Sequence, residues 1–379
     1  MSCKKVAVVN RTNLKNYGSL LQSYALCEAV KMLGYECEII WAKGNLSKNY
    51  DFRLKKIICT LFKLAFHPKL WKKTFALTKY TKETVIDEEK IKLFDAFVEE
   101  NVDRKFYTYG NMKKAAKELY HKVICGSDQI WCSTSLYVDP LMYLRFCPKD
   151  KRIAYAPSIG RDYIPKYNAR VMRKYINGIP CVSIREEKGQ ELIKELTGRD
   201  VPVVIDPTLL VGVEKWDTLK AESSQYDSKD YVLSYFLDEP DEQVQERIKQ
   251  YATENNKKIV VLGSKLSKID DELMECPSCG PKEFITIVAN ASYVMTDSYH
   301  GMLFSIMYGR QFAAIERYCL GFDQSSRQLS VLTMLKIPHR FIKSTEALPM
   351  DIIDYESVDE ILKLNREKSK EYLRKSIEA

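Results

Sequence analysis

A histidine stands where a proton could be exchanged with a bound substrate. The segment Thr296 to Ser305 follows a short apolar run, residues 291–295, and His300 lies near its middle. The run is typical of a buried strand, and residues 302–308 are typical of the helix that follows it. Open α/β sheets bind ligands at the carboxyl ends of their strands, and an imidazole titrates near neutral pH. His300 is therefore a candidate general acid or base, and a hydrogen-bonded structural histidine is the alternative.

Polar residues also follow the first apolar run of the chain. The loop of residues 10–18 ends in Asn16, Tyr17 and Gly18, immediately before the start of a helix. The free backbone N–H groups at a helix N-terminus bind anions or sugar hydroxyls. The glycine spacings of dinucleotide-binding loops and of P-loops are both absent here, so neither nucleotide motif is indicated.

A third strand end carries a set of groups suited to a sugar. Residues 122–125 are followed by Gly126 and then by the carboxylate of Asp128, the amide of Gln129 and the indole of Trp131. An aromatic face covers a sugar ring, while carboxylate and amide groups bind its hydroxyls. The alternative is structural, with Asp128 as a helix cap and Trp131 in the core.

A fourth strand end supplies a cation. Arg185 follows residues 181–184, and its planar guanidinium can donate two hydrogen bonds to a carboxylate or a phosphate. An ion pair with Asp206 is the equally open alternative.

The elements that must position these residues alternate between strand and helix. Strands are predicted at residues 4–10, 36–41, 122–125, 151–156, 181–184, 201–205, 231–236, 258–262, 291–295 and 312–315, and helices at 19–33, 86–101 and 357–379. Such alternation predicts an α/β fold with parallel sheets covered by helices. Asn-Gly and Ile-Pro near residues 177–180 predict a boundary between a domain of residues 1–177 and a domain of residues 178–379, the latter including the terminal helix.

Composition and charge limit the functional classes. The chain has 379 residues, 45% of them hydrophobic, and a formal net charge of +8, which favours anionic partners. Residues 48–82 hold ten Lys or Arg and a single acidic residue, Asp51, with aromatic residues and leucines between them. This segment indicates a basic amphipathic helix for phosphates or an anionic lipid surface, or else a solvated helical face. Nucleic-acid binding is not favoured, because no recognised module accompanies the basic stretch.

The cysteines and the apolar runs bear on the compartment. Eleven cysteines are scattered, and the close pair Cys276 and Cys279 lacks the further ligands that a structural zinc site requires. No signal peptide precedes the first strand, and no apolar run reaches the roughly 20 residues that span a bilayer. We therefore expect a cytoplasmic protein, with peripheral contact at the inner face of a membrane through residues 48–82.

Five short motifs, in order, resemble the polysaccharide pyruvyl transferase family. They are Asn16-Tyr17-Gly18 with the Leu21-Gln22 and Tyr24-Ala25-Leu26 that follow, the segment Gly126 to Trp131, the segment Ser183 to Glu186, the segment Asp206 to Leu210, and the segment Thr296 to Gly301. The resemblance implies two Rossmann-like domains with a central cleft, as in GT-B glycosyltransferases. It also implies that phosphoenolpyruvate binds mainly to the C-terminal domain and a sugar acceptor, free or lipid-linked, to the N-terminal one. The product would be a pyruvate ketal on two hydroxyls of a surface polysaccharide or its precursor.

The resemblance also assigns roles to residues. His300 matches the family's histidine and is expected as general acid/base, with Asp297 beside it, and Arg185 is expected on the carboxylate or phosphate of the donor. Donor-binding residues would be Arg185, Ser298, Tyr299, His300, Gly301, Arg317 and Arg327. Acceptor-binding residues would be Asn16, Tyr17, Gly18, Asp128, Gln129 and Trp131. Phosphoenolpyruvate is a co-substrate, and neither a metal nor a redox cofactor is expected.

One position departs from the family pattern. Many members have Arg-Leu before the histidine, whereas this chain has Ser298 and Tyr299, and Arg317 and Arg327 are the nearest candidates to replace the missing cation. A GT-B glycosyltransferase that uses a nucleotide sugar and a noncatalytic sugar-binding relative are the alternatives.

Overall fold

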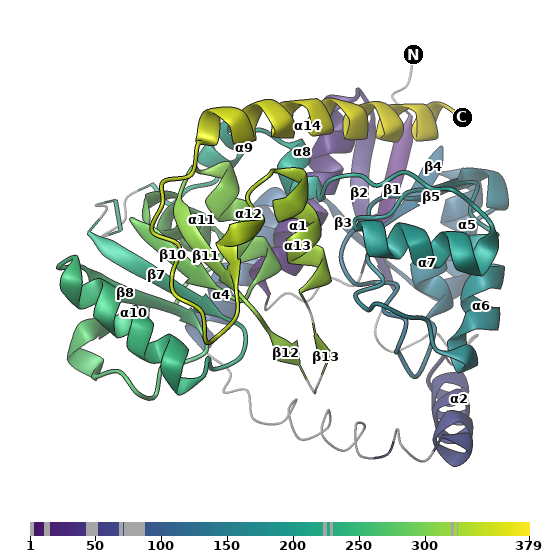
Figure 1. The fold of residues 1–379 in the computed structure, drawn as a ribbon. Coiled ribbons are helices and arrows are strands. Elements are labelled where there is room, and N and C mark those ends of the chain that lie inside the picture. Colours follow the sequence, from purple (N-terminus) through teal and green to yellow (C-terminus); the bar gives the residue numbers. More distant parts are fainter. Residues whose placement is uncertain are drawn as a thin grey trace.

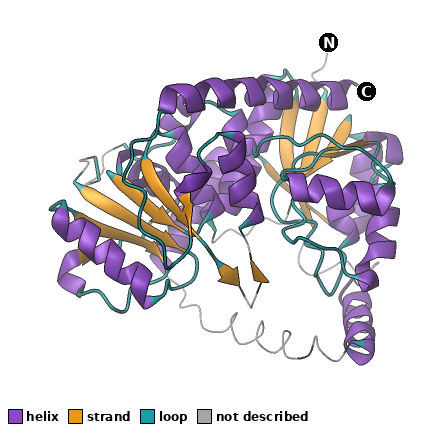
Figure 2. Cartoon of the chain, viewed as in Figure 1, coloured by secondary structure: helices purple, strands orange, loops and turns teal. Residues whose placement is uncertain are grey.

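Two parallel six-stranded sheets form the frame of the molecule (Figures 1 and 2). The computed structural model describes residues 4–10, 16–42, 52–67, 71, 88–222, 226–227, 230–319, 322–323 and 325–379. Helices cover both sheets, as Figure 2 shows, and a small antiparallel pair of strands extends from the second one. The α/β prediction with two Rossmann-like units is thereby confirmed.

The first sheet has the strand order β3-β2-β1-β4-β5-β6, and every neighbouring pair in it is parallel. Its strands are β1 (Lys5–Val9), β2 (Glu36–Ala42), β3 (Arg104–Tyr107), β4 (Lys122–Cys125), β5 (Arg152–Ala154) and β6 (Cys181–Val182). The central strand β1 aligns Val8 with Ile39 of β2 and with Ile124 of β4. These side chains are fully buried because helices lie on both faces of the sheet.

The second sheet has the order β14-β11-β10-β7-β8-β9 and is also parallel throughout. Its strands are β7 (Tyr231–Phe236), β8 (Lys258–Gly263), β9 (Met274–Glu275), β10 (Tyr293–Thr296), β11 (Gln311–Ile315) and β14 (Phe341–Ile342), and the antiparallel pair is β12 (Tyr318–Cys319) with β13 (Phe322–Asp323). All residues of β7 and β10 are buried, as expected for central strands.

The helices connect the strands and carry most of the side chains that join the two units. They are α1 (Tyr17–Met32), α2 (Phe52–Phe66), α4 (Glu88–Asn101), α5 (Tyr109–Glu118), α6 (Lys166–Ile176), α7 (Glu187–Thr197), α8 (Pro207–Leu210), α9 (Val213–Asp217), α10 (Glu242–Glu254), α11 (Pro281–Asn290), α12 (Tyr299–Met307), α13 (Ser326–Met334) and α14 (Tyr355–Glu378). Short 3-10 turns lie at Pro140–Tyr143, Lys149–Lys151, Asp271–Leu273 and Pro338–Arg340.

Aromatic packing joins the two sheets into one body. The ring of Tyr17 at the start of α1 stacks on Phe284 of α11 with centroids 4.6 Å apart, and Phe94 of α4 lies 5.1 Å away on the same ring. Trp216 of α9 contacts both Tyr24 of α1 and Phe304 of α12. Helix α14 runs across the top of both units in Figure 1.

Two predicted strands differ from the structure in an informative way. Residues 181–184 were expected in the second domain, but the first two of them form β6, which pairs with β5 in the first sheet. Residues 201–205 contribute only an isolated bridge between Ile184 and Val203. Pro202 lacks an N–H for a sheet ladder, which explains why no strand continues there. The first sheet therefore extends beyond residue 177.

Of the predicted basic segment, residues 48–82, the structure describes 52–67 and Trp71, and the remainder lies outside the described residues. Residues 11–15 of the loop before α1 lie outside them as well. No helix in the described part of the chain is long and apolar enough to cross a membrane.

Candidate functional site

Charged side chains from both sheets meet between the carboxyl ends of their strands. Arg185 follows β6 and is almost completely buried, and its Nη1 lies 2.6 Å from Oδ2 of the fully buried Asp206. Its Nη2 lies 3.4 Å from Oδ1 of Asp128, the third residue after β4. Arg185 therefore forms the ion pair with Asp206 that was one of its two alternatives. This pair lies within the cluster, where the other alternative would place an anionic ligand.

Asp206 is held in position by the segment it begins. As the N-cap of α8, its Oδ1 accepts hydrogen bonds from the backbone N–H and the hydroxyl of Thr208 at 3.0 and 2.9 Å. The hydroxyl of Ser127 lies 3.4 Å from Oδ2. A carboxylate with these partners is fixed in orientation, so it can in turn orient a neighbouring group.

His300 enters the cluster from the second sheet. It is the second residue of α12, after β10, and its Nε2 lies 3.8 Å from Oδ2 of Asp206. The residue is 7% exposed, and Nε2 has no hydrogen-bond partner among the residues that the structure describes. An imidazole nitrogen that is close to a carboxylate and otherwise unpartnered is suited to exchange a proton with a ligand.

The other edge of the imidazole lies against the backbone of α1. A Cβ built on Gly18 would lie only 2.1 Å from Nδ1 of His300, so the close approach requires glycine. Asn16 caps this helix, with its Oδ1 accepting a 3.0 Å hydrogen bond from the backbone N–H of Ser19. The N-terminus of α1 therefore fixes where His300 can lie.

The electrostatic field of the cluster acts on its titratable groups. Burial lowers the pKa of His300 below its usual value, and the carboxylates of Asp206 and Asp128 oppose that shift. Burial disfavours the charged form of Arg185, but the same two carboxylates help to raise its pKa. In the absence of a ligand the imidazole is therefore neutral at neutral pH, while the guanidinium is charged.

A second guanidinium, that of Arg327, lies over the same aromatic ring as Arg185, the ring of Tyr299. The carbon Cζ of Arg185 lies 4.3 Å from the centroid of its ring, and Cζ of Arg327, on α13, lies 5.5 Å from the same centroid. Burial and the neighbouring Arg185 lower the pKa of Arg327 to about 10. Two guanidinium groups thus lie close to one aromatic ring, and both are of the type that donates hydrogen bonds to carboxylates and phosphates.

Glu186 completes the group. Its Oε1 accepts hydrogen bonds of 2.9 Å from the hydroxyl of Ser158 and from the backbone N–H of Ile159. Burial raises the pKa of this carboxyl, although Arg185 and Arg327 oppose the shift. The cluster therefore contains a carboxyl that takes up a proton more readily than an exposed glutamate.

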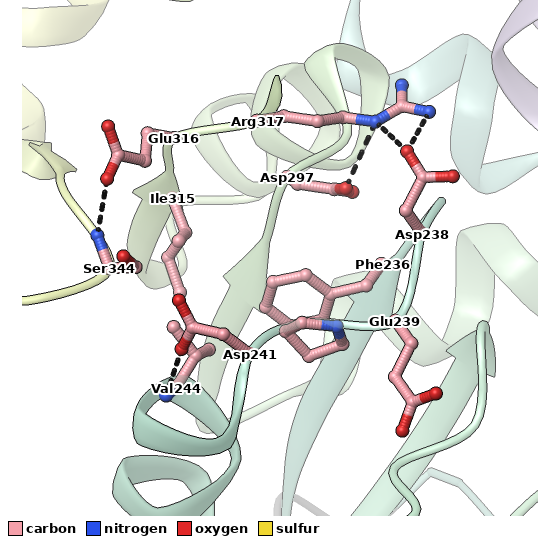
Figure 3. Close-up of a pocket in the computed structure, with 11 residues that line it drawn as sticks. Phe236, Asp238, Glu239, Asp241, Val244, Asp297, Ile315, Glu316, Arg317 and Ser344 are labelled. Atoms are coloured by element: carbon pink, nitrogen blue, oxygen red, sulfur yellow. Dashed lines mark hydrogen bonds and ion pairs between the residues drawn. The ribbon is translucent and has the colours of Figure 1, made fainter. Parts of the chain in front are cut away.

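A separate cavity of about 220 Å³ lies at the carboxyl ends of β7, β10 and β11 (Figure 3). Its lining includes Asp297, and Oδ1 of this residue accepts a 2.8 Å hydrogen bond from the backbone N–H of Leu237. Arg317 lies between two carboxylates, with Nη2 2.5 Å from Asp238 Oδ2 and Nε 3.3 Å from Asp297 Oδ2. Burial raises the pKa of Asp297 to about 6, and Arg317 opposes the rise.

The comparison with protein families decides the relationship. The model of the polysaccharide pyruvyl transferase family matches residues 16–317. The chain belongs to the polysaccharide pyruvyl transferase family. The match covers every residue of the cluster except Arg327. No curated protein matches the chain.

Several solved structures are similar to the chain at low identity. UDP-GlcNAc 2-epimerase from Neisseria meningitidis, bound to UDP-GlcNAc, has 9% identity over 99% of this chain and 94% of that one, with a TM-score of 0.48. The glycosyltransferase SnogD from Streptomyces nogalater has 11% identity over 98% and 96% of the two chains, with a TM-score of 0.45. E. coli ADP-heptose lps heptosyltransferase II has 11% identity over 95% and 99%, with a TM-score of 0.38.

The predicted donor-binding and catalytic residues fall into two groups. Arg185, Tyr299, His300 and Arg327 lie together in the cluster, whereas Arg317 and Asp297 lie at the neighbouring cavity. Ser298 is the N-cap of α12, and its Oγ accepts a hydrogen bond from the backbone N–H of Gly301. The serine at the position of the family's arginine therefore caps the helix that carries His300.

Two of the predicted acceptor-binding aromatics are core residues. Trp131 is 1% exposed, stacks on Tyr143 with centroids 5.0 Å apart, and donates from Nε1 to the carbonyl oxygen of Met142. Tyr17 is 3% exposed and donates from its hydroxyl to the carbonyl oxygen of Cys279. These placements do not fit a ring that covers a sugar, because both side chains are almost completely buried.

The remaining acceptor candidates are closer to the cluster. The side chain of Asp128 is 28% exposed and faces Arg185, and Gln129 lies against Gly160, whose added Cβ would be 2.7 Å from Nε2 of Gln129.

The sequence did not predict that Asp206 would reach His300 as well as Arg185, or that Glu186 would be buried beside them. The only signal for either was their position inside motifs already singled out. Among the described residues, no group of three or more His, Cys, Asp or Glu side chains is arranged to hold a metal ion.

Proposed function

We propose that this protein moves pyruvate from phosphoenolpyruvate onto two hydroxyls of one sugar in a surface polysaccharide or its lipid-linked precursor. The observation that supports the proposal is the meeting of His300 with the Arg185–Asp206 pair between the carboxyl ends of the two sheets, at 3.8 and 2.6 Å from the same carboxylate oxygen. This arrangement offers a proton-transfer group and a buried cation side by side. Both are needed for chemistry on a small anionic enol ester.

The reaction requires a proton at C3 of phosphoenolpyruvate and two oxygen nucleophiles at C2. Protonation of the methylene carbon makes C2 electrophilic, and the two sugar hydroxyls form two C–O bonds to it while the C2–O bond to phosphate breaks. Of the two hydroxyl protons, one balances the proton gained at C3 and the other leaves with inorganic phosphate. The products are a pyruvate ketal and one phosphate, with no change of oxidation state.

In this scheme His300 donates the proton to C3 and then accepts one from a sugar hydroxyl. Asp206 stabilises the imidazolium, because a carboxylate 3.8 Å away favours the charged form. Arg185 and Arg327 bind the carboxylate and phosphate of the donor, and Arg327 takes the place of the arginine that the family carries at the position of Ser298. Arg317 is a less suitable replacement, since it lies at the neighbouring cavity and not on the Tyr299 ring of the cluster.

The formal charges imply that the donor binds together with protons. Two arginines face the carboxylates of Asp128, Asp206 and Glu186, so the cluster is formally negative while His300 is neutral. Protonation of His300 and of Glu186, whose pKa is already raised, turns the balance positive. An incoming trianion favours both protonations by the same electrostatic argument.

The test is calorimetric titration with phosphoenolpyruvate, followed by measurement of phosphate release in the presence of sugar acceptors. We expect binding without added metal, a higher melting temperature, and phosphate release that depends on the acceptor. Binding of a nucleotide sugar with no response to phosphoenolpyruvate would establish the glycosyltransferase alternative. Binding of sugars with no turnover on any acceptor would establish a noncatalytic relative.

A further inference from the structure

Helix α2 presents an apolar face to solvent. Ile58, Phe62 and Phe66 repeat every four residues and are 57, 64 and 66% exposed, and Ile57 and Leu61 on the adjoining row are 54 and 57% exposed. Residues four apart lie on one side of a helix, so these side chains form a continuous apolar surface. Figure 1 shows α2 beyond α6, at the end of the first unit.

The opposite side of α2 fixes it to the protein with few contacts. Lys63 Nζ donates to the carbonyl oxygen of Leu136 at 2.8 Å and to Oδ1 of Asn168 at 2.6 Å. Leu64 is buried, and His67 packs against the ring of Tyr167 with centroids 5.1 Å apart. The helix thus turns Lys63 toward the body and Phe62 and Phe66 away from it, which reverses the usual orientation of an amphipathic helix on a globular domain.

The charge of the sequence in and after α2 indicates the occupant of this surface. Residues 52–82 contain nine Lys or Arg and no Asp or Glu. A basic segment with an exposed apolar helical face is typical of helices that lie in the interface of an anionic bilayer. A second copy of the chain would bring the same positive charge against itself in a symmetric contact, so it is disfavoured as the occupant.

The place of α2 in the fold relates the surface to the site. Asn168, which α2 contacts, donates to the carbonyl oxygens of Ser133 and Ser135 at 2.6 and 2.8 Å. These serines belong to the loop that follows β4, and the same loop contains Asp128 of the cluster. Helix α2 is therefore connected to the charged cluster through Asn168 and the loop that follows β4.

We propose that α2 is an interfacial membrane anchor that inserts Ile58, Phe62 and Phe66 into the outer part of an anionic bilayer. The anchor holds the carboxyl edge of the first sheet near the lipid surface. Resting on the proposed function, it also identifies the acceptor class as a sugar on an anionic lipid carrier rather than a finished, released polysaccharide.

The test is sedimentation of the full chain with vesicles of phosphatidylcholine alone or mixed with phosphatidylglycerol, without phosphoenolpyruvate or acceptor. The parent should bind the mixed vesicles, and the double variant Phe62→Ser/Phe66→Ser should bind at least about tenfold more weakly, because each buried phenylalanine contributes strongly to transfer from water. Leu119→Ser/Leu364→Ser is the matched control. Those leucines are 58 and 56% exposed, on other parts of the surface, and their loss should leave binding unchanged.

Three outcomes would overturn the anchor: no binding of the parent to mixed vesicles, equal binding of the Phe62/Phe66 variant, or a lipid-free dimer that this variant converts to a monomer. The last result would assign the surface to a second copy. Because the binding assay contains no substrate, vesicle binding with no pyruvyl transfer would retain the anchor and reject only the proposed function. Turnover of a water-soluble acceptor by the Phe62/Phe66 variant at the parent rate, with reduced turnover of a lipid-linked one, would support the acceptor class.

Discussion

The contact between Gly18 and His300 gives a sharp test of the site, since it joins two helices from different sheets. In Gly18→Ala the added Cβ would lie 2.1 Å from Nδ1, 2.3 Å from Cγ and 2.8 Å from Cβ of His300. Rotation of the imidazole moves Nδ1 but leaves Cβ in place. The start of α12 must therefore retreat from α1, and His300 must move with it.

The size of the effect follows from opposing contributions. Overpacking of this kind costs about 1–3 kcal/mol. Alanine is favoured over glycine within a helix by up to about 1 kcal/mol, which offsets part of that cost. The protein should therefore remain folded, while displacement of a catalytic group by about 1 Å lowers kcat by about 10²-fold. The assay is acceptor-dependent phosphate release, with urea unfolding measured in parallel.

The chain contains a matched control for this substitution. Gly110 is also the second residue of a helix and also follows a tyrosine, Tyr109, but an added Cβ there meets nothing within 4 Å. Gly110→Ala should keep the parent kcat. If Gly18→Ala also kept it, or if both variants lost activity equally, the assignment of His300 through its contact with α1 would be refuted.

The other predictions concern the charged groups. His300→Ala should lower kcat by about 10²–10⁴-fold with little change in melting temperature or phosphoenolpyruvate affinity, and an unfolded variant would leave the histidine structural. Arg327→Ala should weaken phosphoenolpyruvate binding by about 10–150-fold in calorimetry, from a charged hydrogen bond of about 1.5–3 kcal/mol, whereas Arg317→Ala should weaken it much less. Phosphoenolpyruvate affinity should rise as pH falls from about 8 to 6, with proton uptake visible as a buffer-dependent binding enthalpy, because the ligand favours protonated His300. Burial raises the pKa of Asp297 to about 6, so the native state binds the proton of this carboxyl more tightly than the unfolded state does. The destabilising contribution of Asp297 therefore grows as the pH rises from about 4 to 6. Asp297→Asn should remove that part of the slope in urea unfolding, and an unchanged slope would contradict the burial argument.

The sequence predicts the central strands well because their apolar runs are isolated by polar residues. The predicted strand at 122–125 coincides with β4, and that at 231–236 coincides with β7. The edge strand β3 was not predicted, since its four residues, Arg104–Tyr107, are charged or aromatic and largely exposed. An edge strand needs only one pairing partner, so its sequence carries little of the hydrophobic pattern on which prediction depends.

The site was predictable in its members and not in its geometry. The positions of Arg185 and His300 at strand ends follow from the local pattern, but their common approach to Asp206 depends on how the two sheets face each other. Trp131 was predicted to bind the acceptor but lies in the core. The local sequence does not distinguish a buried indole from one that covers a sugar. The outward apolar face of α2 is a further case, since helical periodicity does not state which side meets solvent.

The two ends of α14 are bonded to different halves of the molecule. Near its start the hydroxyl of Tyr355 donates to the carbonyl oxygen of Arg310, beside β11, and near its end the carbonyl oxygen of Ile377 is 3.0 Å from Nε2 of His121, beside β4. Between them the hydroxyl of Ser369 accepts a 3.1 Å hydrogen bond from the backbone N–H of Ile205. The helix is therefore a strut whose two ends are bonded beside the amino ends of β4 and β11, whereas the charged cluster lies at the carboxyl ends of the strands. Any motion that admits a bulky acceptor must pivot about this strut. The two units would then separate on the side of the charged cluster.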